Sequence, residues 1–430
     1  MRQLTMTTTF FAGLQWLIFM FANTVVIPIS IGEALALPQA EVVAAIQRSF
    51  IFTGIACILQ GYFGHRLALM EGQSGLWWGV ILSLGASAST LGVSLPTLGG
   101  SLAIGIIISG FLVTVFGLLG MGELLKKWFT PVAMAVFLIL LANQLIYIFL
   151  VGMLGLTDSD VINLPVTVFS FFLASIVIWL NIKGKGIIRN FSLLIGMVVG
   201  WAVFVLIFPS KSLHTGGETS SLIAYFPWGE PSFELGIVIT VILTGLLNTS
   251  NTVATLKGAA DVFGQEVSSK KYRSSFFITG ILNMISGVIG VVPYAPYTSS
   301  LGFLQSTGIR ERAPFIVGSV MFIMLGLIPP LGKFFSLMPL SIGHTVLFVA
   351  YLQLFGSALR NIEGLTFTPK TIYRIAIPAL LGMTIMNLPA ASFSSMPTLI
   401  QPLVSNGLLM GILLALLIDN LIRWDKINHA

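Results

Sequence analysis

Long apolar runs separated by short polar breaks make up most of the chain. A helix that crosses a membrane needs about 20 mostly apolar residues. Cutting the sequence at its charged and Pro- or Gly-rich breaks gives fourteen candidates: 11–32, 43–63, 69–92, 98–120, 131–152, 164–181, 191–208, 234–256, 274–292, 294–307, 313–332, 338–358, 373–390 and 403–422. The pattern predicts an all-α polytopic membrane protein with fourteen transmembrane segments.

Basic residues gather in every second break of this pattern. With a cytoplasmic N-terminus, 18 of the 21 Lys and Arg residues lie inside, and Arg48, Lys211 and Lys333 remain. The inside set is Arg2, Arg66, Lys126, Lys127, Lys183, Lys185, Arg189, Lys257, Lys270, Lys271, Arg273, Arg310, Arg312, Arg360, Lys370, Arg374, Arg423 and Lys426. The positive-inside rule expects this asymmetry, so we predict a multi-pass protein of the cell inner (cytoplasmic) membrane with both termini cytoplasmic.

Two pairs of similar words indicate an internal repeat. Residues 117–131 (GLLGMGELLKKWFTP) resemble 326–339 (GLIPPLGKFFSLMP), and the triplet NTV at Asn23 recurs at Asn251. Two halves of seven spans must have opposite orientations, because seven is odd. Inverted repeats are typical of secondary transporters, whose substrates bind near the membrane midplane between interrupted helices.

The third span of each half is interrupted. Residues 67–82 (LALMEGQSGLWWGVIL) contain three glycines around a polar core, and residues 291–308 (VVPYAPYTSSLGFLQSTG) combine two prolines with three successive hydroxyl residues. Proline and glycine break helices and free backbone groups that hydrocarbon cannot satisfy. We therefore expect the two segments to face each other in mid-membrane and to bind a polar solute.

A polar face occurs on the predicted eighth span. Asn248, Asn251, Thr252 and Thr255 are spaced i, i+3, i+4 and i+7 and share one side of a helix. A neutral amide both donates and accepts hydrogen bonds, which suits a purine edge or a CO–NH–CO group. Alternatively, these side chains bond to neighbouring helices or to their own carbonyls.

The motifs, in this order, resemble those of the nucleobase-ascorbate transporter family, the bacterial uracil and xanthine permeases, and especially the purine permease branch. The resemblance covers essentially the whole chain and rests on GLQW at 13–16, EGQSG at 71–75, LLNTSNTVAT at 246–255, YTSSLG at 297–302 and MPLSIG at 338–343. It implies a 7+7 inverted repeat with short strands in segments 3 and 10, and a core domain (1–125 and 211–335) beside a gate domain (126–210 and 336–430).

The resemblance also implies the activity. We expect a secondary active transporter that imports a nucleobase or purine-related heterocycle by alternating access, coupled to H⁺, without a cofactor; family members are often homodimers. Members commonly carry Glu in span eight and Glu or Gln followed by Asn in span ten, whereas this chain has Asn248 and Ser299 there. The substrate-binding candidates are Ser74, Gly75, Asn248, Asn251, Thr252, Tyr297, Ser299 and Ser300.

Two titratable side chains are candidates for proton coupling. A charged side chain at the bilayer centre costs about 2.5–3.5 kcal/mol on insertion scales, so Glu71 in span three has a functional or structural reason to be there. Alternatively, Glu71 neutralises Arg66 or caps the half-helix. His344 in span twelve is the second candidate, with a hydrogen bond to a facing helix as the preferred interpretation. Trp77 and Trp78 either stack on a flat ring or, in the preferred interpretation, face lipid or the interface.

Composition excludes other classes of protein. The chain is 56% hydrophobic and 8% charged, against about 25% charged in soluble domains. Its cations are scattered, so we expect the lipid bilayer and no nucleic acid as partner. Cys57 stands alone, and His65, His214, His344 and His429 lack the spacing of metal ligands, which argues against a metal site and an enzyme. An anion transporter or channel of the same fold remains the alternative, because helix-end dipoles suffice for it.

Overall fold

The computed structural model describes residues 5–122, 127–156, 161–208 and 221–424. Six residues named in the sequence analysis lie outside the described ranges: the basic residues Arg2, Lys126, Lys211 and Lys426, and the histidines His214 and His429.

Helices form almost all of the regular structure, and each predicted span contains at least one of them. They are α1 (Met6–Thr24), α2 (Val26–Ala34), α3 (Gln39–Tyr62), α4 (Gly75–Ser87), α5 (Leu95–Leu119), α7 (Pro131–Met153), α8 (Leu164–Lys183), α9 (Ile187–Asn190), α10 (Ser192–Ile207), α11 (Leu235–Phe263), α12 (Ser269–Ile289), α13 (Ser299–Thr307), α14 (Arg312–Gly326), α15 (Pro329–Ser336), α16 (Leu340–Asn361), α17 (Pro369–Asn387), η1 (Ala390–Phe393), α18 (Gln401–Val404) and α19 (Gly407–Leu421). Within the described ranges, seven helical segments are long and apolar enough to cross a membrane when α1 and α2 count together as Met6–Ala34. The number is eight when α14 and α15, bent by 84°, also count as one span.

Several of these helices begin where a polar cap is followed by proline. Ser94, Thr130, Asn163 and Thr368 each accept a hydrogen bond from a backbone N–H of the first turn, and Pro follows within two positions. The cap satisfies an N–H that has no partner inside the helix, and Pro loses nothing at a position whose N–H is free. These sequence signals fix the starts of α5, α7, α8 and α17.

The two interrupted segments meet as a pair of short strands. Strand β1 (Glu71–Gln73) pairs antiparallel with β2 (Tyr294–Pro296), with Gly72 opposite Ala295. Strand β1 leads through Ser74 into α4, and β2 leads into the short helix α13. All residues of both strands are buried.

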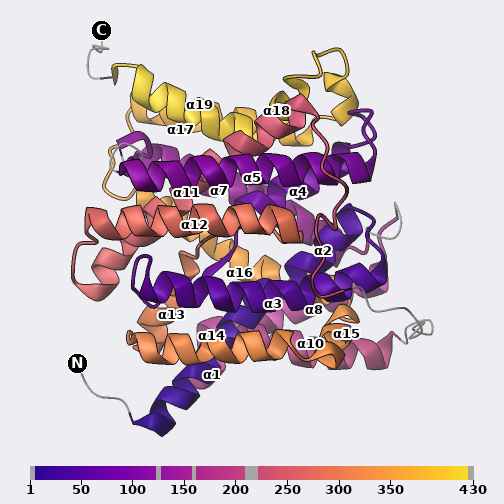
Figure 1. Ribbon diagram of the computed structural model, residues 1–430, viewed down its shortest axis with the longest axis vertical. Helices are drawn as coiled ribbons and strands as arrows, with labels where there is room; N and C mark the ends of the chain where they lie inside the picture. Colours follow the sequence, from indigo (N-terminus) through magenta and orange to yellow (C-terminus); the bar gives the residue numbers. More distant parts are fainter. Residues whose placement is uncertain (1–4, 123–126, 157–160, 209–220, 425–430) are drawn as a thin grey trace.

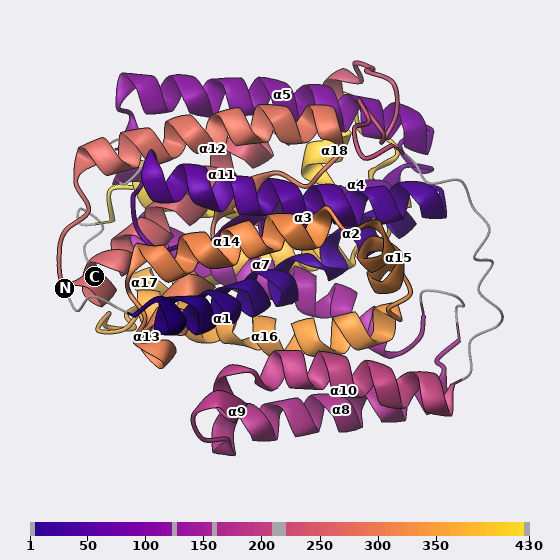
Figure 2. The same ribbon diagram turned by 60° about the horizontal axis from the view of Figure 1, so that its bottom comes forward.

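The long helices pack in two groups. In the first, α5 packs on α12 and α11, and α14 packs on α3 and α1; Figures 1 and 2 show α5, α12, α3 and α14 side by side in that order. In the second, α7 packs on α16, α17 on α19, and α8 on α10. Helices α8 and α10 stand out from one side of the molecule in Figure 2.

Glycine allows close contact between α5 and α12. A Cβ added at Gly280 of α12 would lie 2.7 Å from the Gly110 carbonyl oxygen of α5, and one added at Gly110 would lie 2.7 Å from the Gly280 oxygen. Small residues at such crossings let helix backbones approach within van der Waals distance in a membrane.

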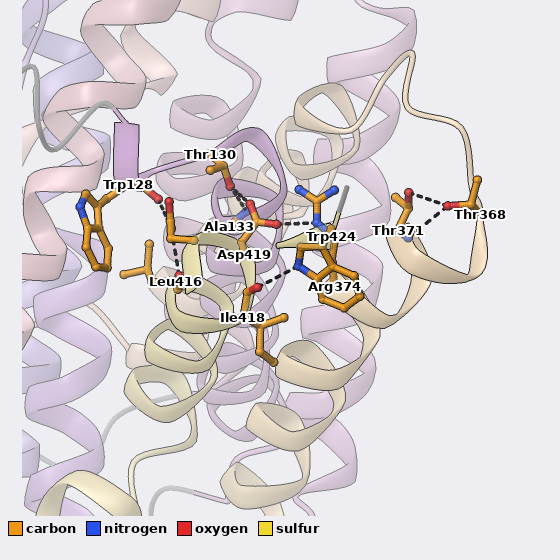
Figure 3. Close-up of polar contacts among 11 residues, drawn as sticks. Trp128, Thr130, Ala133, Thr368, Thr371, Arg374, Leu416, Ile418, Asp419 and Trp424 are labelled. Atoms are coloured by element: carbon orange, nitrogen blue, oxygen red, sulfur yellow. Dashed lines mark hydrogen bonds and ion pairs between the residues drawn. The ribbon is translucent and has the colours of Figure 1, made fainter. Parts of the chain in front are cut away.

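A buried carboxylate ties the second group together at one end (Figure 3). Asp419 of α19 accepts hydrogen bonds from Thr130, the cap of α7, and from Nε of Arg374 on α17 at 2.5 Å. The next residue, Asn420, donates to the Trp128 carbonyl at 2.9 Å. One helix end therefore holds two others in place.

Candidate functional site

The strand pair is the centre of the candidate site. Beyond the paired residues, the Ser74 N–H donates to the Pro293 carbonyl and the Tyr297 N–H donates to the Met70 carbonyl, both at 2.8 Å. These bonds extend the ladder by one step at each end. The two interrupted segments therefore lie against each other, as the sequence predicted, although Ser299 and Gly302 of α13 are exposed.

Asn248 of α11 joins both interrupted segments. Its Oδ1 accepts from the Ser74 hydroxyl at 2.6 Å and from Nδ2 of Asn251 at 2.9 Å, and its own Nδ2 donates to the Tyr294 carbonyl at 3.0 Å. The side chain is only 2% exposed. The opening of α4, strand β2 and α11 are thus fixed to one another through a single amide that both donates and accepts.

The same face of α11 makes a second connection to the tenth segment. The Thr255 hydroxyl bonds to the Pro296 carbonyl at 3.1 Å and to the Thr298 hydroxyl at 2.8 Å. Thr252 is buried between these two connections along the helix. The predicted polar face of α11 therefore does turn toward the interrupted segments.

Tyr297 contacts strand β1 and helix α1 beside this region. Its hydroxyl donates to the Gln73 carbonyl and lies 3.4 Å from the Asn23 carbonyl of α1. The Tyr351 phenol of α16 interacts with the Tyr297 phenol, and a Cβ added at Gly75 would lie 3.5 Å from Cε1 of Tyr351. A side chain of the second helix group thus reaches the start of α4.

The two serines of the tenth segment have different surroundings. The Ser300 hydroxyl is buried and accepts from the Met70 N–H at 3.0 Å, whereas Ser299 is exposed. Ser300 is therefore a structural link to the third segment. Ser299 leaves its hydroxyl accessible at the first turn of α13.

Both half-helices begin without a side-chain cap. Neither Ser74, before α4, nor Thr298, before α13, accepts a hydrogen bond from the first turn of the helix that follows. The first N–H groups of a helix have no partner inside it and carry partial positive charge. At α13, however, the Ser300 and Leu301 N–H groups donate to the Tyr297 and Thr298 carbonyls, each at 3.0 Å. The start of α4 is therefore the place where a solute with carbonyl oxygens can bind such groups.

Glu71 points away from this site. Because side chains alternate along a strand, Glu71 and Gln73 share a face; Oε1 of Glu71 accepts from the Thr279 hydroxyl of α12 at 2.6 Å, and Nε2 of Gln73 donates to the Ser49 hydroxyl of α3 at 3.0 Å. Among the described residues no basic side chain forms an ion pair with Glu71. The interpretation that it neutralises Arg66 is therefore wrong.

Two other side-chain predictions are also wrong. His344 is buried beside Phe149, with ring centroids 5.7 Å apart, and neither ring nitrogen has a hydrogen-bond partner in the described part of the chain. Trp77 and Trp78 are fully buried and do not face lipid. Nε1 of Trp78 donates to the Ser30 hydroxyl at 2.7 Å, so this ring helps to fix α4 against α2.

No group of three or more His, Cys, Asp or Glu residues within the described ranges could hold a metal ion. An apolar groove of about 520 Å³ lies between α8 and α10, but its lining offers almost no polar group to a heterocycle. The strand pair, the openings of α4 and α13 and the polar face of α11 therefore form the candidate binding site.

The arrangement of the helices resembles that of two solved structures. The transmembrane domain of the cyanobacterial bicarbonate transporter BicA superposes with a TM-score of 0.64 at 15% identity, over 92% of this chain and 96% of that one. The structure of SLC26A9 superposes with a TM-score of 0.63 at 12% identity, over 96% of this chain and 64% of that one. At these identities the similarity concerns the fold alone.

The sequence comparison gives the family. Residues 7–391 match the family model Xan_ur_permease, described as "Permease family", and the chain belongs to this family. Relatives from Bacillus subtilis include "Putative purine permease YwdJ" (29% identity, 96% of each chain), "Xanthine permease" (23%, 95% of this chain and 92% of the relative) and "Uric acid permease PucK" (22%, 97% and 96%). The chain is a multi-pass permease of the cell membrane and not an enzyme, and the predicted family is confirmed.

Proposed function

We propose that the chain imports a nucleobase or purine-related heterocycle across the cytoplasmic membrane by alternating access, coupled to H⁺. The main support for this proposal is that the two interrupted segments meet at the amide of Asn248, beside the uncapped start of α4, inside a permease fold. The names of the relatives, which include purine, xanthine and uric acid permeases, support a purine-like substrate and do not favour the anion alternative.

A 7+7 inverted repeat is part of the proposal, and the strand region supports it. A twofold axis that superposes Ser74 on Tyr297 also superposes Met70 on Pro293. It therefore exchanges the hydrogen bond from Ser74 to Pro293 with the bond from Tyr297 to Met70. The same axis takes Glu71 to Tyr294. Each of these two side chains bonds to a threonine of the facing helix: Thr279 of α12 for Glu71, and Thr53 of α3 for Tyr294.

Helix packing supports the same symmetry and the division into domains. The α5–α12 pair corresponds to α14–α3, and the α5–α11 pair corresponds to α14–α1. In the second group, the α8–α10 pair corresponds to α17–α19. We assign the first group to a core domain (1–125 and 211–335) and the second to a gate domain (126–210 and 336–430). The gate domain moves against a core domain that holds the strand pair. Nε2 of Gln144 on α7 donates to the Gly79 carbonyl on α4 at 2.8 Å, one of the contacts this motion must change.

Recognition follows from the donors and acceptors at the site. In the proposed complex, the free N–H groups at the start of α4, from Gly75 onward, donate hydrogen bonds to carbonyl oxygens of the substrate ring. Asn251 and Ser299 are not fully buried, so they can add polar contacts. Ser74, Asn248, Tyr297 and Ser300 hold these groups in position. Asn248 sets the preference for the ring's edge through the position of these groups, and Ser299 sets it by direct contact; the buried Thr252 lies on the same face of α11.

The charge pattern orients the protein. We place both termini and the basic loops in the cytoplasm, where the positive-inside rule puts them. The homodimer stays a prediction.

Uptake by intact cells tests the proposed function. Cells without endogenous nucleobase permeases that express the chain are given labelled uracil, xanthine, hypoxanthine, urate or allantoin at two pH values. We expect saturable uptake of at least one purine, faster at the lower external pH. Uptake of labelled sulfate or bicarbonate with no uptake of any of these heterocycles would instead identify an anion transporter.

A further inference from the structure

A second polar region lies behind the strand pair, between α3 and α12. Glu71 contacts Thr279, and Nε2 of Gln60 on α3 donates to the same Thr279 hydroxyl at 2.9 Å. The Gln60 oxygen lies 3.4 Å from the N–H of His65, in the loop after α3. Polar side chains therefore continue from Glu71 to the end of the core where α3 finishes and α12 begins.

Three buried polar atoms along this line have no hydrogen-bond partner in the described chain. They are Oε2 of Glu71, the hydroxyl of Ser275 and Nε2 of His65. A single buried polar group without a partner costs about 1–3 kcal/mol, so three in one region need an explanation. Buried water is the ordinary one, because it bonds to buried polar groups that protein atoms leave unsatisfied.

The polar side of α12 extends this region toward the charged end. Lys271, Ser275 and Thr279 are spaced by four residues and so lie on one face of the helix. Lys271 is partly exposed, whereas Ser275 and Thr279 are buried. The stripe thus leads from solvent at Lys271 to the carboxyl group of Glu71.

His65 borders this region in its neutral form. Burial, with Lys271 nearby, lowers the pKa of His65 to about 3. Its Nδ1 accepts from the Leu67 N–H at 3.1 Å, so the neutral ring carries its proton on Nε2. His65 can therefore donate a hydrogen bond to water without itself carrying the transported proton.

We propose that a file of water molecules between α3 and α12, bounded by Gln60, Ser275 and His65, exchanges the proton of Glu71 with the cytoplasm behind the strand pair, apart from the substrate site. This rests on the coupling through Glu71 and on the orientation proposed above. In the import cycle Glu71 takes up one proton from the outside in the outward-facing state. Unloading then passes this proton from Glu71 Oε2 to the water file and the cytoplasm, and leaves the carboxylate. The strand pair separates this route from Ser74 and Asn248 on the α11 side.

Few other groups near Glu71 can titrate. Cys57 faces it from α3, with Sγ 3.4 Å from the Glu71 N–H, and Tyr294 faces it from β2. Helix α12 contributes the neutral Thr279 and, two turns away, Lys271. Helix α1, which also touches β1, has no titratable side chain in Met6–Thr24. The proton that moves through this region therefore belongs to Glu71.

Proton uptake by proteoliposomes of the full chain tests the route. A pH-sensitive dye records proton uptake when purine is added, and equilibrium binding of the same purine is measured in parallel. We expect Ser275→Val, which puts methyl groups into the file, to slow coupled proton uptake about tenfold and to leave purine binding unchanged. The control Ser286→Val changes a buried serine of the same helix whose hydroxyl donates to its own Leu282 carbonyl, and should behave as the wild type.

The outcomes separate the route from the proposed function. Wild-type proton uptake by Ser275→Val would contradict the route and leave coupling intact. Purine transport by the wild type without proton uptake would contradict the coupling and the route together, and no purine transport would contradict the proposed function.

Thiol labelling gives a second measurement if Ser275→Val does not fold. In a Cys57→Ser background, Ser275→Cys should react with a small water-soluble thiol reagent in inside-out vesicles, equally with and without bound purine. No reaction, or protection by purine, would contradict a separate hydrated route.

Discussion

Asn248 shows how one side chain can define the site without being free to bind substrate on its own. All three of its hydrogen bonds go to protein atoms, at Ser74, Tyr294 and Asn251. The amide therefore acts by fixing the opening of α4 against β2. Sequence reasoning found the residue through its helical spacing but not its role, because the spacing does not show which partners already occupy it.

Replacing this amide should affect stability and transport together. Asn248→Ala leaves buried polar groups without partners, so we expect about 1–3 kcal/mol of lost stability and at least about tenfold slower purine uptake, since 1.4 kcal/mol corresponds to that factor. Thermal unfolding in detergent and initial uptake rates measure the two effects. Thr249→Ala is the matched control, because the Thr249 hydroxyl bonds to its own helix at Leu246. Unchanged uptake by both Asn248→Ala and Ser299→Ala would reject their proposed part in recognition.

Glu71 should decide whether the chain concentrates its substrate. One proton moving down a gradient of one pH unit supplies about 1.4 kcal/mol, enough for about tenfold accumulation. Glu71→Gln keeps an acceptor for Thr279 but carries no exchangeable charge, so we expect purine exchange to continue while accumulation falls to equal concentrations at every pH. Accumulation by this variant with the wild-type pH dependence would show that the proton is carried elsewhere.

At the scale of elements, apolar run length predicted where helices lie but not where they break. The run 11–32 divides at Val25 into α1 and α2, and 313–332 divides into α14 and the sharply bent α15. Glycine and proline marked the two interrupted segments correctly, because they remove helical hydrogen bonds and favour other backbone conformations. The burial of Trp77 and Trp78 did not follow from the sequence, since a tryptophan at a helix start looks the same whether it faces lipid or a second domain.

The crossing of α5 and α12 should tolerate no added side chain. Gly280→Ala places a Cβ against the backbone of α5, and overpacking of this kind typically costs about 1–3 kcal/mol. Gly302→Ala on α13 is the control, because nothing lies within 4 Å of the added atom. Thermal unfolding should show a lower midpoint for the first variant and not for the second; equal midpoints would mean that the helices are not in backbone contact.

The contact of Asp419 should hold the ends of α7, α17 and α19 together. Asp419→Asn removes the charge opposite Arg374 and disturbs the bond to the α7 cap, Thr130. Because Arg374 is 26% exposed and can regain water, we expect a loss of about 1–2 kcal/mol, below the cost of breaking a fully buried pair. Thermal unfolding measures it, with Glu363→Gln, which removes the charge of an exposed carboxylate, as the control. A midpoint equal to that of the wild type would contradict the anchoring role.

In the whole molecule, the proposed transport requires the gate domain to move against the core domain while the strand pair stays intact. The ladder, Asn248 and Thr255 join the third, eighth and tenth segments into one unit. The contacts of Gln144 with Gly79 and of Tyr351 with Gly75 join the proposed gate domain to α4 of the proposed core domain. The division into core and gate domains came only from resemblance to a family and stays a prediction, because helix packing depends on side-chain contacts that hydropathy does not record.

The position of a bound purine would show whether the strand pair and the start of α4 form the binding site. A structure of the full chain determined with the purine that it transports should show the ring at the start of α4, with a carbonyl oxygen at the Gly75 N–H and an edge near Asn251 and Ser299. A ring bound away from the strand pair, with the ends of α4 and α13 unoccupied, would contradict the account.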